Sequence, residues 1–181
     1  MFNDEVKLIK KCLRKNPEAQ RFLYEKYKVM WFMICLRYGR NKDEAEDMLQ
    51  EGLISVFKDL KQYDVKKAAF STWSSKVMVN AALQNLRKWK KLDFHEDIGT
   101  HTNLVMHEED VYDKLGAKEL TAIVQGLPNG YRVVFNLYVI EGYKHREIAE
   151  MLNISENTSK SQLRKAKSML RDQLEHIIQY K

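Results

Sequence analysis

The sequence predicts an all-α protein made of two small helical domains joined by a flexible acidic linker. Glycine and proline are scarce, at 7 and 2 of 181 residues, whereas 44% of the residues are hydrophobic. The apolar residues recur at the spacing of a helix face rather than in the alternation of a half-buried strand. Charge divides the chain into three blocks, and this division sets the expected domain boundaries.

The three charge blocks differ in sign. Residues 1–92 carry 20 Lys and Arg against 11 Asp and Glu, residues 93–112 carry six acids and no Lys or Arg, and residues 113–181 carry 11 bases and 8 acids. We therefore expect one domain over residues 1–92, a linker over 93–112 and a second domain over 113–181. Two basic domains favour a polyanionic partner such as nucleic acid.

Some classes of protein are excluded by what the chain lacks. No apolar run reaches the roughly 18 residues that a membrane-spanning helix needs, and the first residues lack the pattern of a signal peptide. We expect no membrane insertion and a cytoplasmic location. Cys12 and Cys35 lie inside helical patterns without the spacing of a metal motif, so we expect reduced thiols, with Cys35 buried.

The first domain is expected to begin with a helix over residues 4–15. Asn16 then caps a second helix, which has Pro17 at its first position and runs to about Arg40. The aromatic residues of this second helix are expected in the core: Phe22, Tyr24, Tyr27, Trp31, Phe32 and Tyr38. Asn41 caps a third helix. Its core face is expected to contain Ala45, Met48, Leu49, Leu53, Val56, Phe57 and Leu60.

A loop over residues 61–69 precedes the fourth helix, which is expected to run from Phe70 to Lys91. Its inward side should contain Phe70, Trp73, Val77, Leu83, Leu86 and Trp89. The other flank carries Asn80 and a series of cations: Lys76, Arg87, Lys88, Lys90 and Lys91. Cations in such a series can follow a nucleic-acid backbone, and a solvated surface is the alternative reading.

Four helices are expected in the second domain, near residues 113–125, 131–140, 145–152 and 155–179. Val133, Val134 and Phe135 could locally form a strand, because β-branched residues favour one. Their position between helical segments favours a buried helix instead.

The pattern of the segment Lys144–Arg171 predicts a helix-turn-helix. Ile148, Ala149 and Leu152 share one face of its first helix, and Asn153 is a residue type that tolerates the left-handed conformation of a tight turn. Ser155 can cap the second helix. The front of that helix carries Asn157, Lys160, Ser161, Arg164 and Lys165. Amide, hydroxyl and long cationic side chains suit a helix in the DNA major groove, with a solvated cationic face as the alternative.

No enzymatic signature accompanies these features. The linker contains His95, Glu96, His101, His107 and Glu108, but they match neither HExxH nor a thiolate zinc motif. The sequence has no glycine-rich phosphate loop, and neither cysteine has a partner set for nucleophilic catalysis. We expect no metal, no cofactor and no catalytic activity.

Two blocks of sequence resemble a known family. The first is EAEDMLQEGLISVFKDL followed by FSTWSSKVMVNAALQNLRK, and the second is LPNGYRVVFNLYVIEGYKHREIAEMLNISENTSKSQLRKAK. Together they resemble the bacterial alternative sigma factors of the extracytoplasmic-function type. This resemblance implies a sigma-2 and a sigma-4 domain, binding to core RNA polymerase, recognition of −10 and −35 promoter elements, and help in opening the promoter. Such proteins are commonly held by an anti-sigma factor.

The resemblance also assigns roles to residues. The third helix is expected to dock on the clamp helices of the largest polymerase subunit through Glu46, Asp47, Gln50 and Glu51. The −10 element is expected to meet Tyr63, Asp64, Lys66, Lys76, Asn80, Arg87 and Lys88. The −35 element is expected to meet Asn157, Lys160, Ser161, Arg164 and Lys165. Candidate contacts with the flap of the second-largest subunit are Tyr131, Val134, Tyr138 and Ile140.

Three positions depart from the family pattern. Gly52 stands where a valine or similar side chain is common in the family, and this predicts looser helix packing. Val79 stands where a basic residue is common, and Gln84 stands where an aspartate is common. The last two leave the −10 base preference open. Two other functions compete with that of a sigma factor. One is a free-standing helix-turn-helix regulator that binds duplex DNA without polymerase, and the other is an interaction-only protein such as a sigma-like decoy.

Overall fold

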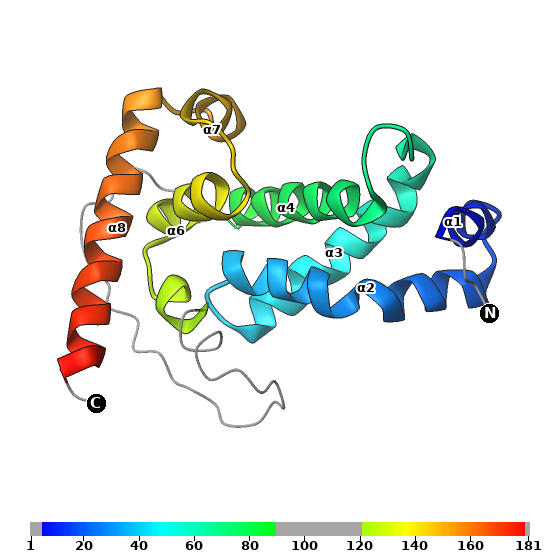
Figure 1. Ribbon diagram of the computed structural model, residues 1–181, viewed down its shortest axis with the longest axis horizontal. Coiled ribbons are helices and arrows are strands. Elements are labelled where there is room, and N and C mark those ends of the chain that lie inside the picture. Colours follow the sequence, from blue (N-terminus) through cyan, green and yellow to red (C-terminus); the bar gives the residue numbers. More distant parts are fainter. Residues whose placement is uncertain (1–4, 90–120, 180–181) are drawn as a thin grey trace. The chain divides into compact units, whose positions relative to one another are not determined.

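The structure, a computed structural model, describes residues 5–89 and 121–179 of the chain. All regular structure in these two ranges is helical, which confirms the all-α class with two helical domains (Figure 1). Contacts divide the chain into two compact units, Met1–Lys88 and Trp89–Lys181, and each is considered by itself. The expected linker, with its His and Glu residues, and the cations Lys90 and Lys91 lie outside the described residues.

The first unit contains α1 (Glu5–Leu13), α2 (Pro17–Tyr38), α3 (Lys42–Asp59), a short 3₁₀ helix η1 (Leu60–Gln62) and α4 (Phe70–Lys88). Both expected caps are present, because Asn16 Oδ1 accepts from the Ala19 amide at 2.9 Å and Asn41 Oδ1 accepts from the Glu44 amide at 2.9 Å. Each cap satisfies an amide that the helix itself leaves unbonded.

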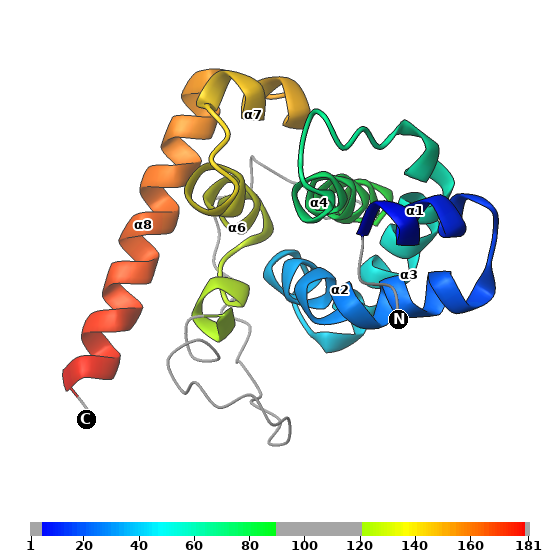
Figure 2. The ribbon, with the colours of Figure 1, turned by 45° about the vertical axis from the view of Figure 1, so that its right-hand side comes forward.

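The core of this unit lies where α3 packs against both α2 and α4. Figure 1 and Figure 2 show these three helices side by side. Trp31 is fully buried there, and its indole Nε1 donates to the buried Ser74 Oγ at 3.1 Å. A buried indole N–H normally requires such a partner, so this bond fixes α2 against α4.

The expectation that every aromatic residue of α2 lies in the core is wrong for Phe22. Phe22 is 42% exposed, and the apolar residues Val29 and Met33 of the same helix are 43% and 36% exposed. Tyr27, Trp31 and Tyr38, by contrast, are buried. Only one side of α2 faces the other helices, and these three exposed residues repeat along the opposite side. Tyr24 and Phe32 are half-buried.

The expectation of loose packing at Gly52 is also wrong. A Cβ atom added at Gly52 would lie 2.2 Å from Met78 Sδ, and both residues are buried. The absence of a side chain therefore lets α3 and α4 approach closely, and Met78 fills the space that a valine would take.

The second unit contains a helical turn over residues 121–125, α6 (Asn129–Phe135), a π-helical turn η2 (Asn136–Ile140), α7 (His145–Leu152) and α8 (Glu156–Gln179). Val133 and Val134 are fully buried within α6, which confirms the buried helix and rules out the strand. Helix α8 packs against α6 and α7. None of the helices in the described ranges is long and apolar enough to cross a membrane.

A buried arginine organises the start of α6. Arg132 is 1% exposed, and its guanidinium donates to the carbonyl oxygens of Gln125 and Leu127, both at 2.9 Å. A third bond goes to the side-chain oxygen of Asn129. Arg132 thereby satisfies carbonyl groups at the end of the 121–125 turn that no helix bond can reach.

Candidate functional site

The helix-turn-helix has the expected local geometry. Asn153 ends α7 with φ 55° and ψ 49°, the left-handed conformation that a tight turn needs. Ser155 Oγ accepts from the Thr158 amide at 2.9 Å and so caps α8. His145 Nδ1 lies 2.9 Å from Oγ of the buried Ser159, which ties the start of α7 to the first turns of α8.

The front of α8 exposes most of the residues expected to meet DNA. Asn157, Lys160 and Arg164 are exposed, and the half-buried Ser161 donates its hydroxyl to the Thr158 carbonyl at 2.9 Å. Lys165 differs, because it is half-buried and its ammonium lies 5.9 Å from the centre of the Tyr131 ring. A cation–π contact thus holds Lys165 to one side of this front.

Two further cations extend the front of α8. Lys167 and Arg171 are exposed, and they line an open hollow of about 390 Å³ together with Lys160, Leu163, Arg164 and Ser168. The spacing of Lys160, Arg164, Lys167 and Arg171 places four cations along one side of a helix. Lys167 and Arg171 were not predicted as DNA contacts from the sequence, although the 4-3-4 spacing of these four cations was a signal for them.

Helix α3 presents a polar face that includes one exposed apolar side chain. Glu46, Asp47, Gln50 and Glu51 are all exposed. Ile54 is 66% exposed, and its spacing from Gln50 and Glu51 places it on the same side of the helix. The sequence interpretation missed Ile54, although its seven-residue spacing from Asp47 was a signal.

The exposed flank of α4 forms a second polar surface. Lys76, Asn80, Gln84 and Arg87 are exposed at spacings that place them on one side of the helix. Gln84 therefore lies among the candidate DNA contacts. Val79, by contrast, is 1% exposed and belongs to the core, so it contributes nothing to this surface.

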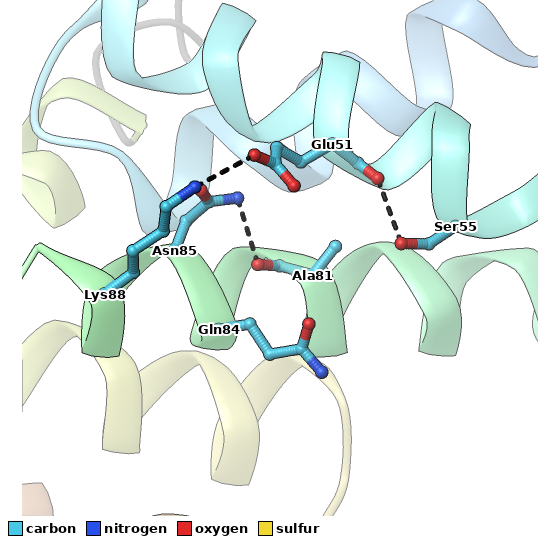
Figure 3. A pocket seen from close by; sticks show the side chains of 6 residues that line it. All are labelled: Glu51, Ser55, Ala81, Gln84, Asn85 and Lys88. Atoms are coloured by element: carbon cyan, nitrogen blue, oxygen red, sulfur yellow. Dashed lines mark hydrogen bonds and ion pairs between the residues drawn. The ribbon is translucent and has the colours of Figure 1, made fainter.

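Lys88 lies at the end of α4, where its ammonium is 3.3 Å from Glu51 Oε1 on α3 (Figure 3). A candidate DNA contact and a candidate polymerase contact are thus paired within one unit.

The loop before α4 places Tyr63, Asp64 and Lys66 together, each in a different setting. The Tyr63 ring packs against Phe70 and Trp73, at centroid distances of 5.3 and 5.6 Å, and its hydroxyl donates to the Ala68 carbonyl at 3.2 Å. Burial, followed by nearby carboxylates, raises the pKa of Tyr63. Asp64 Oδ1 accepts from the Lys66 amide at 2.9 Å, so this carboxylate shapes the loop, whereas the Lys66 side chain is exposed.

The four candidate flap contacts divide into two groups. Tyr131 and Val134 are 8% and 0% exposed, and they belong to the core of the second unit. Tyr138 and Ile140 are 38% and 45% exposed on the π-helical turn. Val139, between them, is 47% exposed and was missed from sequence, because a π-helical turn directs its residues differently from an α-helix.

Comparison with known proteins accounts for both units. Residues 23–91 match the family model for sigma-70 region 2, and residues 117–170 match the model for sigma-70 region 4. The chain is 30% identical to the ECF RNA polymerase sigma factor SigW of Bacillus subtilis, over 94% of this chain and 97% of SigW. It is 30% identical to the RNA polymerase sigma factor SigV of the same organism, over 82% and 86% of the two chains.

A solved structure, that of CnrH in complex with the cytosolic domain of CnrY, is 18% identical and covers 93% of this chain and 96% of that chain, with a TM-score of 0.49. The region 2 match covers the unit that a free-standing helix-turn-helix regulator leaves without a role, and the comparisons give that alternative no support. The identity to SigW extends over nearly the whole of both chains. The chain belongs to the extracytoplasmic-function sigma factors of the sigma-70 family.

Proposed function

We propose that this RNA polymerase sigma factor uses three separate binding surfaces. Helix α3 docks on the clamp helices of the largest polymerase subunit, α4 and its preceding loop bind and help to open the −10 element, and α8 binds the −35 element. The observation that carries the proposal is the adjacency of an acidic face on α3 and a cationic flank on α4 within one folded unit, joined by the Glu51–Lys88 pair.

The α3 face has the make-up of a protein-binding surface. Exposed carboxylates suit pairing with arginine on a partner helix and guide the approach of that partner. Ile54 adds an apolar side chain, 66% exposed, beside Gln50 and Glu51. Side chains that become fully buried at the centre of an interface, inside a rim that excludes water, contribute most to affinity. We therefore place Ile54 at the centre of the docking surface, with Glu46, Asp47, Gln50 and Glu51 around it.

The α4 flank suits a separated DNA strand. Lys76, Arg87 and Lys88 supply positive charge along the helix, and the amides of Asn80 and Gln84 can hydrogen-bond base edges. The Tyr63 ring beside Trp73 offers an aromatic surface near the start of the helix. Base stacking on aromatic side chains favours bases outside the duplex, which promoter opening requires.

Helix α8 combines base and phosphate contacts. Arg164 is exposed at the middle of the front, where a guanidinium can contact a guanine edge through two hydrogen bonds. Lys160, Lys167 and Arg171 are placed for phosphates, which supply affinity without sequence preference. Polymerase holds both DNA-binding domains at once, so that contacts that are weak alone become effective together.

The remaining assignments belong to the same proposal. We propose that residues 1–92 act as the sigma-2 domain, 93–112 as the linker and 113–181 as the sigma-4 domain. The exposed Tyr138, Val139 and Ile140 are the flap contacts of the sigma-4 domain. The protein acts in the cytoplasm without catalytic activity of its own, and an anti-sigma factor holds it inactive.

The test is promoter-specific transcription by purified core polymerase, with and without this chain, on a library of genomic promoters. Specific transcripts only in its presence are expected. Polymerase binding without specific transcripts indicates a decoy, and tight binding to duplex sites without polymerase indicates a free-standing regulator.

Two variants then separate the surfaces. Asp47→Lys should weaken polymerase binding and leave DNA binding by the second domain intact, and unchanged polymerase affinity would remove the docking role. Arg164→Ala should weaken −35 binding by about 1–3 kcal/mol if this residue contacts a base edge. An unchanged preference at every −35 position contradicts that contact.

A further inference from the structure

One ion pair joins the docking helix to the DNA-binding helix of the first unit. The Lys88 ammonium lies 3.3 Å from Glu51 Oε1, and the two residues are 37 positions apart in the sequence. They border a small hollow of about 90 Å³, which is also lined by Ser55, Ala81, Gln84 and Asn85. Figure 3 shows the Lys88 side chain extending from α4 toward the Glu51 carboxylate.

Two other polar side chains at this hollow donate hydrogen bonds to backbone carbonyl groups and not to the Glu51 carboxylate. The Asn85 amide nitrogen donates instead to the Ala81 carbonyl at 3.1 Å, and the Ser55 hydroxyl donates to the backbone carbonyl of Glu51 at 3.0 Å. Lys88 lies within ion-pair distance of the Glu51 carboxylate. The close approach of α3 and α4 at Gly52, next to Glu51, brings the two side chains within reach.

We infer that the Glu51–Lys88 ion pair couples polymerase docking to −10 DNA binding. This inference rests on the proposed roles of α3 and α4. In the free chain, each side chain neutralises the other, so Lys88 attracts DNA less and Glu51 attracts polymerase less. When a polymerase arginine takes the Glu51 carboxylate, Lys88 is released toward the DNA phosphates. The pair thus delays DNA binding until the chain has docked.

The size of the coupling follows from exposure. The side chains of Lys88 and Glu51 are 69% and 52% exposed, so water and salt screen the pair. An exposed pair of this kind changes an equilibrium by about 1.5- to 5-fold. Because coupling between two sites is reciprocal, polymerase docking should raise the affinity for DNA by the same factor by which bound DNA raises the affinity for polymerase.

The first measurement is binding of the full chain, without polymerase, to a short fluorescein-labelled oligodeoxythymidine at low salt, followed by fluorescence anisotropy. Glu51→Gln should raise the affinity about 1.5- to 5-fold more than Glu46→Gln does. Glu46→Gln removes the same charge from the same helix without touching Lys88, so it reports the long-range effect of charge alone. In a Lys88→Met background, the two Glu variants should have equal effects.

The second measurement is affinity for core polymerase without DNA. Lys88→Met should raise this affinity about 1.5- to 5-fold relative to Lys10→Met, which removes an exposed cation from α1. In a Glu51→Gln background, the advantage of Lys88→Met should disappear.

The outcomes separate this inference from the proposed function. If Lys88→Met weakens DNA binding but Glu51→Gln behaves like Glu46→Gln in both backgrounds, the coupling is overturned and the −10 role of α4 stands. If neither the parent nor Glu51→Gln binds the oligonucleotide, the DNA-binding role of α4 fails and the coupling fails with it. The coupling is established by two results together: an excess effect of Glu51→Gln on DNA binding that is lost with Lys88→Met, and an excess effect of Lys88→Met on polymerase binding that is lost with Glu51→Gln. If Lys88→Met gives the same polymerase affinity as Lys10→Met, the coupling is overturned.

Discussion

The close approach of α3 and α4 at Gly52 leads to a test in which a second substitution reverses the effect of the first. A Cβ atom at Gly52 would lie 2.2 Å from Met78 Sδ, 3.3 Å from its Cε and 3.7 Å from the Ala81 Cβ. Since ordinary van der Waals contact begins near 3.5 Å, the Met78 sulfur must move by about 1.3 Å to admit one methyl group. Met78 is 0% exposed, so it must move within a packed core.

Two opposed energies decide the outcome for Gly52→Ala. Overpacking a core costs about 1–3 kcal/mol, while alanine is favoured over glycine inside a helix by about 0.8–1.0 kcal/mol. The free energy of unfolding should therefore fall by about 0–2 kcal/mol. In a Met78→Ala background the clash is absent, and Gly52→Ala should instead raise the free energy of unfolding by about 1 kcal/mol. The sign reversal, not the size of either effect, tests the geometry.

The assay is urea unfolding followed by tryptophan fluorescence. Of the three tryptophans, Trp31 and Trp73 lie in the first unit, so two of the three fluorophores report the unit that contains Gly52. Stabilisation by Gly52→Ala in both backgrounds would refute the close approach, because it would show that the methyl group meets nothing. Equal destabilisation in both would show that the obstacle is not Met78.

Other features give further expectations. Arg132→Met should lower the free energy of unfolding of the second unit by about 1–3 kcal/mol, because the carbonyl groups that it holds lose their partner; an unchanged melting curve by circular dichroism would contradict this. Burial raises the pKa of the Cys12 thiol to about 11 and of the Cys35 thiol to about 12, so both should react with iodoacetamide at pH 8 far more slowly in the folded than in the urea-unfolded chain. Because these values exceed the ordinary pKa of 9.0, unfolding becomes easier as pH rises from about 9 through the folded values. Arg171→Gln should reduce the slope of log affinity for −35 DNA against log salt by about 1 while leaving base preference unchanged. Ile54→Ala should weaken polymerase binding by at least about 1 kcal/mol, measured by competition with the parent chain, and equal competition would remove Ile54 from the docking surface.

Helix boundaries were predictable from sequence because they depend on local chemistry. Asn16 and Asn41 cap their helices, and Asn153 adopts the left-handed turn, as their side chains and backbone preferences predict. The burial of Val133 and Val134 in a helix followed from their position between helical segments. The side of α2 on which Phe22 lies did not follow from such reasoning, because apolar residues occur on more than one side of this helix.

Features that depend on distant contacts could not be predicted from one sequence. The effect of Gly52 depends on Met78, which lies on another helix, and the position of Lys165 depends on Tyr131 of α6. Of the candidate surfaces, the sequence indicated the polar residues; the spacing of Ile54 placed it on the same face as Asp47, but its 66% exposure follows from the packing of the helix. The roles of these surfaces stay predictions until the variants are measured.

The π-helical turn between α6 and α7 constrains the number of residues that the chain can have at this point. The Glu141 amide reaches back five residues to the Asn136 carbonyl at 2.9 Å, so this turn holds one residue more than an α-helical turn. Deleting one codon here would restore α-helical pairing and turn all that follows by about 100°. The helix-turn-helix would then leave α6 in a different direction. The sequences of related proteins should therefore show substitutions in this turn far more often than a single-residue insertion or deletion.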